Sequence, residues 1–222
     1  MKSVFMKKLC IFDFDGTLFD SITDVVNCFN QTFINLGYET LDLEQYKKSL
    51  GGNFDEIIDL ILKENNNEEN IELVKKTYEQ LYSKDKKENT HLYPGTYKLL
   101  RQLQEEGFIL AINSNRKPGS INYFINLFLS DIDFIDIQGH VPNHPSKPDT
   151  YGVNTILKKA GVEKEDCIYI GDSITDIKTA RNAQIDCILV NWGYGVGDVY
   201  DNEYPLAVVD NAEDILKLVK KE

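Results

Sequence analysis

Residues 18–90 carry apolar side chains at a spacing typical of helices. The apolar residues recur every three or four positions, so each group lies along one face of a helix. Three helices are predicted, at about residues 21–36, 54–63 and 69–82. Ser21 is the expected N-cap of the first, with Asp24 three residues on, and Gly37 is its expected end. The polar stretch 64–68 is a predicted loop, so this part of the chain is expected to be all-helical.

A different pattern precedes and follows this helical part, where short apolar runs alternate with helical segments. Strands are predicted at about residues 8–14, 108–112, 134–137, 167–170, 185–190 and 207–209. Helices are predicted at about residues 97–107, 120–129, 151–160, 174–182 and 213–220. Strands that alternate with helices of this length form crossover units of a parallel sheet, and such crossovers are almost always right-handed. The expected fold is an α/β core with a doubly wound, Rossmann-like parallel sheet.

The helical part interrupts this core directly after its first strand. We therefore expect a discontinuous α/β core of residues 1–17 and 91–222, with an inserted helical cap of residues 18–90. Open α/β sheets bind ligands at the carboxyl ends of their strands. A helical insert at this point of the chain would lie over that edge of the sheet.

Composition and charge exclude several classes of protein. The chain of 222 residues has a net charge of −12, so the protein as a whole would repel a nucleic-acid backbone. No apolar run approaches the roughly 20 residues of a membrane span, and the N-terminal apolar run is too short for a signal peptide. We expect a cytoplasmic protein that interacts with neither nucleic acid nor membranes. The four cysteines lack metal-site spacing and are expected to be buried thiols.

Polar residues stand next to the predicted strand ends at four places. They are Asp13 and Asp15, Ser114 and Asn115, Lys147, and Asp172 and Asp176. Because the carboxyl ends of parallel strands share one edge of a sheet, these side chains can converge although they lie far apart in the sequence. Clustered carboxylates need a cation, and oxygen ligands beside a phosphate favour Mg²⁺. A metal and local donors would also allow an acidic protein to bind a small anion.

The residue types suit phosphoryl transfer, which needs an in-line nucleophile, neutralised phosphate oxygens and a proton for the leaving group. Asp13 can attack the phosphate and form an aspartyl-phosphate that water then cleaves. Asp15 lies two residues further on an extended segment, so its side chain points the same way. It is the expected general acid toward the leaving group and general base toward water.

These residues carry a resemblance to a known family. The segment Asp13-Phe14-Asp15-Gly16-Thr17-Leu18 resembles the nucleophile signature of the haloacid dehalogenase-like superfamily. Three further parts of the chain look like the other three motifs of the superfamily, in the order in which the family has them. They are Ser114 after an apolar strand, Lys147-Pro148, and Gly171-Asp172-Ser173-Ile174-Thr175-Asp176. The helical insert looks like the superfamily's first cap class. Members similar to phosphoglycolate phosphatase are suggested by Asn115-Arg116 and by Trp192-Gly193-Tyr194-Gly195.

The resemblance implies a set of metal and phosphate contacts. The side chains of Asp13 and Asp172 and the backbone carbonyl of Asp15 would hold Mg²⁺. Asp176 would act as a further ligand or through a metal-bound water. The residues expected to hold the phosphate are Ser114, Asn115 and Lys147.

The predicted function is Mg²⁺-dependent hydrolysis of small organic phosphate monoesters. Phosphoglycolate-like molecules or sugar phosphates are the expected substrates, and a small phosphorylated metabolite is the expected partner. Arg116 lies beside the presumed site and could contact a substrate anion. The segment 50–54, with Gly51 and Gly52, resembles the family's specificity loop, but its preference cannot be read from the sequence. No pattern defines the oligomeric state.

Other functions stay open. A phosphomutase of the β-phosphoglucomutase type uses the same four motifs, although such mutases carry a histidine soon after the nucleophile and residues 21–36 contain none. A pyrophosphatase or nucleotidase would show the same motifs. Haloacid dehalogenase activity is disfavoured, because those members lack the second aspartate that Asp15 supplies. A non-catalytic phosphate sensor could dispense with Asp13 or Asp15, and this chain has both.

Each motif also has a purely structural interpretation. The Asp-rich turn at residues 13–16 could cap the helix that follows, and Asp176 could be a helix-start carboxylate favoured by the helix dipole. Ser114 could be a turn residue and Lys147 a solvated loop lysine. The occurrence of all four motifs in order favours the functional interpretation.

Overall fold

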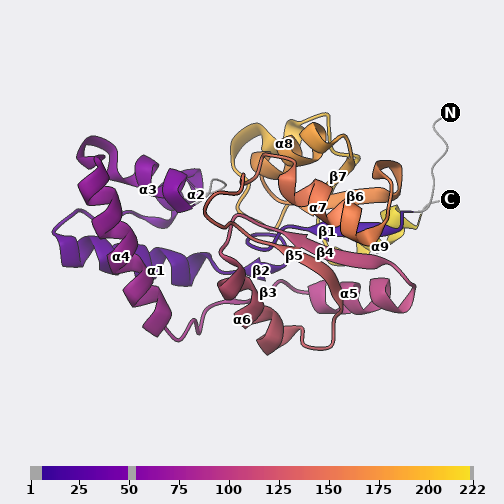
Figure 1. Cartoon of the computed structure of the whole chain (residues 1–222), viewed down its shortest axis with the longest axis horizontal. Helices are drawn as coiled ribbons and strands as arrows, with labels where there is room; N and C mark the ends of the chain where they lie inside the picture. The colour runs from indigo at the N-terminus through magenta and orange to yellow at the C-terminus, as the bar shows by residue number, and fades with distance from the viewer. Residues whose placement is uncertain (1–6, 50–53, 221–222) are drawn as a thin grey trace.

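A parallel sheet of six strands forms one part of the molecule (Figure 1). The computed structural model describes residues 7–49 and 54–220, so residues 50–53 of the predicted specificity loop at 50–54 lie outside the described part. The strands are β1 (Leu9–Phe12), β4 (Ile109–Asn113), β5 (Phe134–Gln138), β6 (Cys167–Gly171), β7 (Asp186–Val190) and β8 (Ala207–Val209). Their order is β5-β4-β1-β6-β7-β8, and every neighbouring pair is parallel. The first strand is therefore central.

Helices cover both faces of this sheet. One face packs against α5 (Thr96–Glu105), α6 (Pro118–Phe128) and α9 (Ala212–Val219), and the other against α7 (Tyr151–Ala160) and α8 (Ile174–Ala183). Successive residues of β1 point to opposite faces: Cys10 and Phe12 join the first apolar cluster, and Leu9 and Ile11 the second. A strand buried on both sides is continuously apolar, which explains its sequence. The predicted doubly wound α/β fold is confirmed.

The helices within residues 22–84 pack around an apolar cluster of their own. They are α1 (Ile22–Leu36), α2 (Leu43–Ser49), α3 (Phe54–Leu62), the 3₁₀ helix η1 (Lys63–Asn65) and α4 (Glu68–Lys84). Fully buried side chains such as Tyr46, Ile58 and Val74 lie in this cluster. In Figure 1 these helices form a lobe beside the sheet, which we call the helical region.

The chain enters and leaves the helical region through a short antiparallel pair, β2 (Phe19–Asp20) and β3 (His91–Leu92). The carboxylate of Asp24, near the start of α1, strengthens this connection. It accepts hydrogen bonds from the side chain of Asn89 at 2.8 Å and from the hydroxyl of Thr90 at 2.6 Å. Two segments far apart in the sequence are thus fastened together where they meet the sheet.

The prediction for the start of α1 was wrong in one respect. Ser21 precedes the helix, but its side chain makes no capping hydrogen bond. Its hydroxyl donates instead to Asp15, and the amides of Ser21 and Ile22 donate to the hydroxyl of Tyr194 at 2.7 and 3.0 Å. Gly37 ends the helix in a left-handed conformation, as its sequence predicts.

Several short elements differ from the prediction. Helix α2 and the pair β2–β3 were not predicted, because seven residues or fewer carry too little periodicity to identify an element. The predicted loop at 64–68 is partly η1, and α4 begins at Glu68 because the side chain of Asn67 accepts from the Asn70 amide. Two further 3₁₀ helices are η2 (Lys164–Asp166) and η3 (Gly197–Asp201).

Two other sequence expectations can be compared with the described residues. All four cysteines are buried and unpaired, as predicted. None of the described helices has the length and apolar character needed to cross a membrane.

Candidate active site

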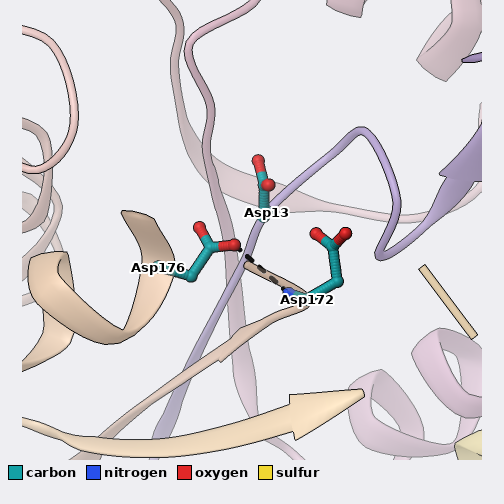
Figure 2. A group of neighbouring side chains, drawn as sticks. All are labelled: Asp13, Asp172 and Asp176. Atoms are coloured by element: carbon teal, nitrogen blue, oxygen red, sulfur yellow. Dashed lines mark hydrogen bonds between the residues drawn. The ribbon is translucent and has the colours of Figure 1, made fainter. Parts of the chain in front are cut away.

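Three carboxylates meet where β1 and β6 end. Asp13 follows β1, Asp172 follows β6, and Asp176 lies in the first turn of α8. One oxygen of each lies within 4.8 Å of one oxygen of the others, and all three residues are buried. Figure 2 shows their side chains approaching one another from these segments. The convergence expected from the parallel sheet is therefore present.

Lys147 balances part of this negative charge. Its ammonium lies 2.8 Å from Oδ1 of Asp13 and 2.8 Å from Oδ1 of Asp176. Burial alone would lower the pKa of Lys147, but the two carboxylates raise it well above its usual value. The lysine is therefore a fixed positive charge in contact with the proposed nucleophile, and not a solvated loop residue.

Asp172 is held by residues of two other segments. Its Oδ2 accepts from the backbone amide of Tyr194 at 2.6 Å, and its Oδ1 from the hydroxyl of Thr17 at 3.3 Å. Gly16, in a left-handed conformation with φ of 81°, passes so close that a Cβ there would collide with this carboxylate. The glycine of the first motif is thus required by the approach of the aspartate of the last.

Asp176 uses both of its oxygens within the protein. Its Oδ1 bonds Lys147, and its Oδ2 accepts from the backbone amides of Asp172 and Ser173 at 3.2 and 3.1 Å. The hydroxyl of Ser173 donates to the same oxygen at 2.7 Å, and Ser173 and Asp176 form a capping box at the start of α8. Asp176 is therefore both a helix-capping residue and the partner that orients Lys147.

Crowding of buried carboxylates shifts their protonation. Burial and the charge of Asp176 raise the pKa of Asp13 to about 7, and Lys147 opposes this rise. Burial and the charges of Asp176 and Asp13 raise the pKa of Asp172 well above its usual range. Like charges this close disfavour ionisation unless a cation joins them.

The site suits a small divalent cation. Its candidate ligands are carboxylate oxygens, and burial together with neighbouring carboxylates raises the pKa of Asp13 and of Asp172, so a cation between them would favour their ionised forms. Hard oxygen ligands with excess negative charge fit Mg²⁺. Oδ2 of Asp176 already accepts three hydrogen bonds and its Oδ1 bonds Lys147, whereas each oxygen of Asp172 accepts only one. Asp13 and Asp172 are therefore better placed than Asp176 to hold the ion directly.

Asp15 lies in a different environment, turned toward Arg116. The guanidinium donates from Nε to Oδ2 of Asp15 at 2.9 Å and from Nη2 to Oδ1 at 2.8 Å. Its Nη1 donates to the hydroxyls of Tyr82 and Ser120 at 2.6 and 2.7 Å. Arg116 thus joins the second aspartate of the first motif to helix α4 of the helical region.

Ser114 and Asn115 follow β4 at the same edge of the sheet. Ser114 is buried and lines the cavity described below, and its Oγ accepts from the backbone amide of Arg116 at 3.2 Å. The side-chain amide of Asn115 accepts from the backbone N–H of Lys147 at 2.8 Å and donates to its carbonyl at 3.1 Å. The described contacts of the Asn115 side chain therefore position Lys147.

A cavity of about 510 Å³ opens over these residues. Asp13, Asp172 and Lys147 line one end, and residues of α1, α3 and α4 line the other. The cavity thus lies between the carboxyl ends of the strands and the helical region.

Sequence reasoning gave Tyr194 too little weight. It assigned this residue no functional role beyond membership of the 192–195 segment, but Tyr194 lines the cavity, holds Asp172 through its amide and accepts from the amides of Ser21 and Ile22 through its hydroxyl. These contacts are made by the backbone amide of Tyr194 and by its hydroxyl to a distant segment, and neither kind of contact produces a periodic pattern in the sequence. Only its proximity to a glycine-rich segment after a strand hinted at a role.

The fold and the site together define a class of protein. The family model described as haloacid dehalogenase-like hydrolase matches residues 10–190, a span that includes all four motifs. The chain belongs to this family, and the predicted membership is confirmed.

Known relatives indicate which members are similar. A phosphoglycolate phosphatase of Vibrio cholerae is 29% identical over 225 residues, covering 99% of this chain and 98% of its own. A phosphoglycolate phosphatase of Vibrio parahaemolyticus is 26% identical and covers 96% of each chain. A solved structure of a candidate phosphoglycolate phosphatase from Lactobacillus delbrueckii has a TM-score of 0.89 at 25% identity, covering 98% of this chain and all of that one. These relatives support the predicted enzyme class, a phosphatase.

Proposed function

We propose that the protein is a Mg²⁺-dependent phosphatase that hydrolyses small organic phosphate monoesters through an aspartyl-phosphate intermediate. The observation that carries this proposal is the placement of Asp13 at the end of the central strand. There it contacts Lys147, lies beside Asp172 and faces a cavity large enough for an organic substrate.

Asp13 is the proposed nucleophile. Lys147 and the backbone amide of Phe14 both bond its Oδ1, the latter at 2.6 Å, so the side chain is fixed. We propose that Oδ2 attacks phosphorus, forming the Asp13–phosphate bond as the bond from phosphorus to the ester oxygen breaks. Lys147, with Ser114, would hold the phosphate oxygens during this step.

Asp15 is the proposed acid and base. It would donate a proton to the departing ester oxygen, so that the organic product leaves as a neutral alcohol. In the second half-reaction it would take a proton from the water that attacks the aspartyl-phosphate, releasing inorganic phosphate and restoring Asp13. Its ion pair with Arg116 would have to loosen for it to reach these atoms.

Asp13 and Asp172, with the backbone carbonyl of Asp15, are the proposed Mg²⁺ ligands. When bound, the ion would neutralise charge on the carboxylates and on the phosphate oxygens, which lowers the barrier to attack by an anion. Asp176 would orient Lys147, or it would contact the ion through a bound water.

The helical region is the proposed cap. We propose that residues 18–90 cover the site, and that residues 1–17 and 91–222 form the catalytic core. Covering the cavity would keep water from the first half-reaction and select substrates by size and chemistry.

An activity screen with the purified protein tests the proposal. Mg²⁺-dependent release of inorganic phosphate is expected from phosphate monoesters, with phosphoglycolate and sugar phosphates as the first substrates because of the names of the relatives. Removal of the metal with EDTA should abolish release, and added Mg²⁺ should restore it.

The decisive variant is Asp13→Asn, which removes the nucleophile while keeping its size. It should lower turnover of every ester by at least about 10⁴-fold. Asp131→Asn is the matched control, since Asp131 is exposed and pairs with Arg101 at the surface. Turnover of Asp13→Asn close to that of the control would refute the assignment.

A further inference from the structure

The end of the cavity farther from the carboxylates is lined by apolar and aromatic side chains. They are Val25 and Phe29 of α1, Phe54 and Ile57 of α3, and Tyr78 and Tyr82 of α4, and we call them the apolar end. The rings of Phe29 and Phe54 lie 4.3 and 4.9 Å from that of Tyr78, measured between centroids. The helical region therefore offers the substrate a wall of packed rings and aliphatic side chains.

Positive charge at this cavity is already neutralised. Three described lining residues are cationic, and each is ion-paired: Arg116 with Asp15, Lys117 with Glu79, and Lys147 with Asp13 and Asp176. A carboxylate on the organic part of a substrate would have to displace one of these protein carboxylates. Among the described residues the cavity does not favour a second negative charge on the substrate.

Three of the lining hydroxyls near the apolar end already make hydrogen bonds within the protein. Those of Tyr82 and Ser120 accept hydrogen bonds from Arg116, and that of Ser83 donates to the carbonyl of Gln80 at 3.0 Å. A polyhydroxylated group placed there would exchange many hydrogen bonds to water for the few that the hydroxyls of Tyr78, Tyr82 and Ser120 can still make. Burial of unpaired polar groups is unfavourable, so this end of the cavity disfavours sugars.

We propose that the preferred substrate is a phosphate monoester whose alcohol carries an apolar ring or hydrocarbon group, which packs against the apolar end. This inference rests on the proposed function and narrows its substrate class. The phosphate would lie at Asp13 and Lys147, and the apolar group would extend between α1, α3 and α4. The ester is cleaved as described above, so the products are an apolar alcohol and inorganic phosphate.

The size of the cavity agrees with such a substrate. A volume of about 510 Å³ lies within the range of roughly 300–1,000 Å³ typical of sites that enclose drug-sized ligands. Glycolate, one of the smallest hydroxy acids, would leave most of it unfilled. Each methylene buried from water is worth about 0.8 kcal/mol, which corresponds to at most about a fourfold gain in affinity.

A series of primary alkyl phosphates tests the inference. Ethyl, butyl and hexyl phosphate have leaving groups of nearly equal basicity, so differences among them report binding and not bond strength. We expect kcat/KM to rise by about two- to fourfold per added methylene, and 2-phenylethyl phosphate to match or exceed hexyl phosphate. Phosphoglycolate and glycerol 3-phosphate should be poorer than hexyl phosphate by at least about tenfold.

Substitutions in the apolar end should remove this dependence on chain length. Ile57→Asn on α3 should lower kcat/KM for hexyl phosphate by about tenfold and leave ethyl phosphate within about twofold. Leu60→Asn is the matched control, because Leu60 lies on the same helix, is 59% exposed and does not line the cavity. Val25→Thr, which keeps shape and adds one hydroxyl, serves as a second variant if Ile57→Asn does not fold.

A binding measurement separates recognition from turnover. Hexylphosphonate, which has no ester bond to break, should bind the Mg²⁺-loaded protein at least about tenfold more tightly than ethylphosphonate in calorimetry. A flat or falling alkyl series, with Mg²⁺- and Asp13-dependent turnover intact, would overturn this inference alone. Absence of turnover of every ester would overturn the proposed function and this inference with it.

Discussion

The two ends of the cavity are built on opposite principles. At the sheet, buried charged groups from four segments hold one another at fixed distances, with Lys147 between Asp13 and Asp176. At the helical region, the lining consists mainly of rings and aliphatic side chains that belong to the edge of an apolar cluster. The first kind of surface fixes the atoms needed for a reaction, and the second excludes water around whatever is bound.

This difference separates two properties of the proposed enzyme. Substitutions at the sheet end should affect all phosphate esters alike, because every ester presents the same phosphate. Substitutions at the helical end should affect esters according to their organic group. Arg116 and Tyr194 join the two ends of the cavity. Their substitution should have effects on turnover between these two kinds.

The largest expected effect in this comparison is that of Lys147→Met. The change removes the charge that contacts Asp13 and Asp176, so kcat/KM should fall by about 10²–10³-fold for every ester, regardless of its length. Steady-state kinetics on ethyl and hexyl phosphate check this. Lys159→Met, at a surface ion pair with Asp136, is the control. A loss confined to the longer ester would break the proposed separation.

The next effect is on metal affinity. Asp172→Asn retains an oxygen that can accept from the Tyr194 amide but removes a negative charge, so the Mg²⁺ concentration for half-maximal activity should rise by at least about tenfold. A Mg²⁺ titration of activity measures this shift. Asp214→Asn, which alters an exposed carboxylate paired with Lys217, should leave the titration unchanged. An unchanged midpoint for Asp172→Asn would exclude it as a ligand.

A smaller effect is expected from Arg116→Ala, which removes the partner of Asp15. Because Arg116 pairs with Asp15 and reaches the apolar end only through the hydroxyl of Tyr82, kcat should fall about tenfold while KM changes little. Arg101→Ala, at the surface, is the control. The opposite outcome, a raised KM with unchanged kcat, would mean that Arg116 binds a substrate anion, as the sequence left open.

The hydroxyl of Tyr82 should matter less. Tyr82→Phe keeps the ring at the apolar end and removes the acceptor of one Arg116 hydrogen bond, so we expect about a twofold fall in kcat for all esters. Kinetics on ethyl and hexyl phosphate, compared with Tyr97→Phe at an exposed position, measure it. A tenfold loss would indicate that contact between the helical region and Arg116 controls Asp15.

The smallest expected effect is on stability without metal. The folded protein raises the pKa of Asp13 to about 7 from an ordinary value of 3.8, so between these pH values it binds more protons than the unfolded chain. Stability of the metal-free protein should therefore fall as pH rises through this window. We expect Tm to be at least about 3 °C lower at pH 7.5 than at pH 5.

Two comparisons test this origin of the pH effect. Asp13→Asn should show a smaller fall in Tm over the same range, because its side chain does not ionise. Saturating Mg²⁺ should also reduce the fall, because the cation favours the ionised carboxylates. An equal fall in all three cases would place its cause elsewhere in the protein.

The end of the cavity at the sheet was predictable from the sequence because a change from apolar to polar residues marks where each strand ends. An apolar run such as 9–12 followed by Asp13 fixes which edge of the sheet the carboxylate occupies, and parallel pairing brings Asp172 to the same edge. The order of motifs then identified the family. The central position of β1 also follows, because the doubly wound topology builds outward from the first strand.

The helical end was not predictable in the same way. Periodicity identified α1, α3 and α4, but not which parts of their apolar faces would line a cavity and which would pack against one another. Val25 and Val26 are neighbours in the sequence, yet only Val25 lines the cavity. The pairing of Arg116 with Asp15 was missed for a related reason, since side-chain contacts between distant segments depend on packing that no local pattern encodes.

The central position of β1 has a consequence for local stability. Its residues are bonded on both sides, to β4 and to β6, whereas β2 and β3 form a pair of only two residues each at the neck of the helical region. Amide hydrogens of residues 9–12 should therefore be among the slowest in the chain to exchange with solvent, and those of the neck much faster. The proposed nucleophile, Asp13, directly follows β1, and β1 can open only if its hydrogen bonds to both β4 and β6 break. Local opening of the helical region therefore leaves the position of Asp13 unchanged.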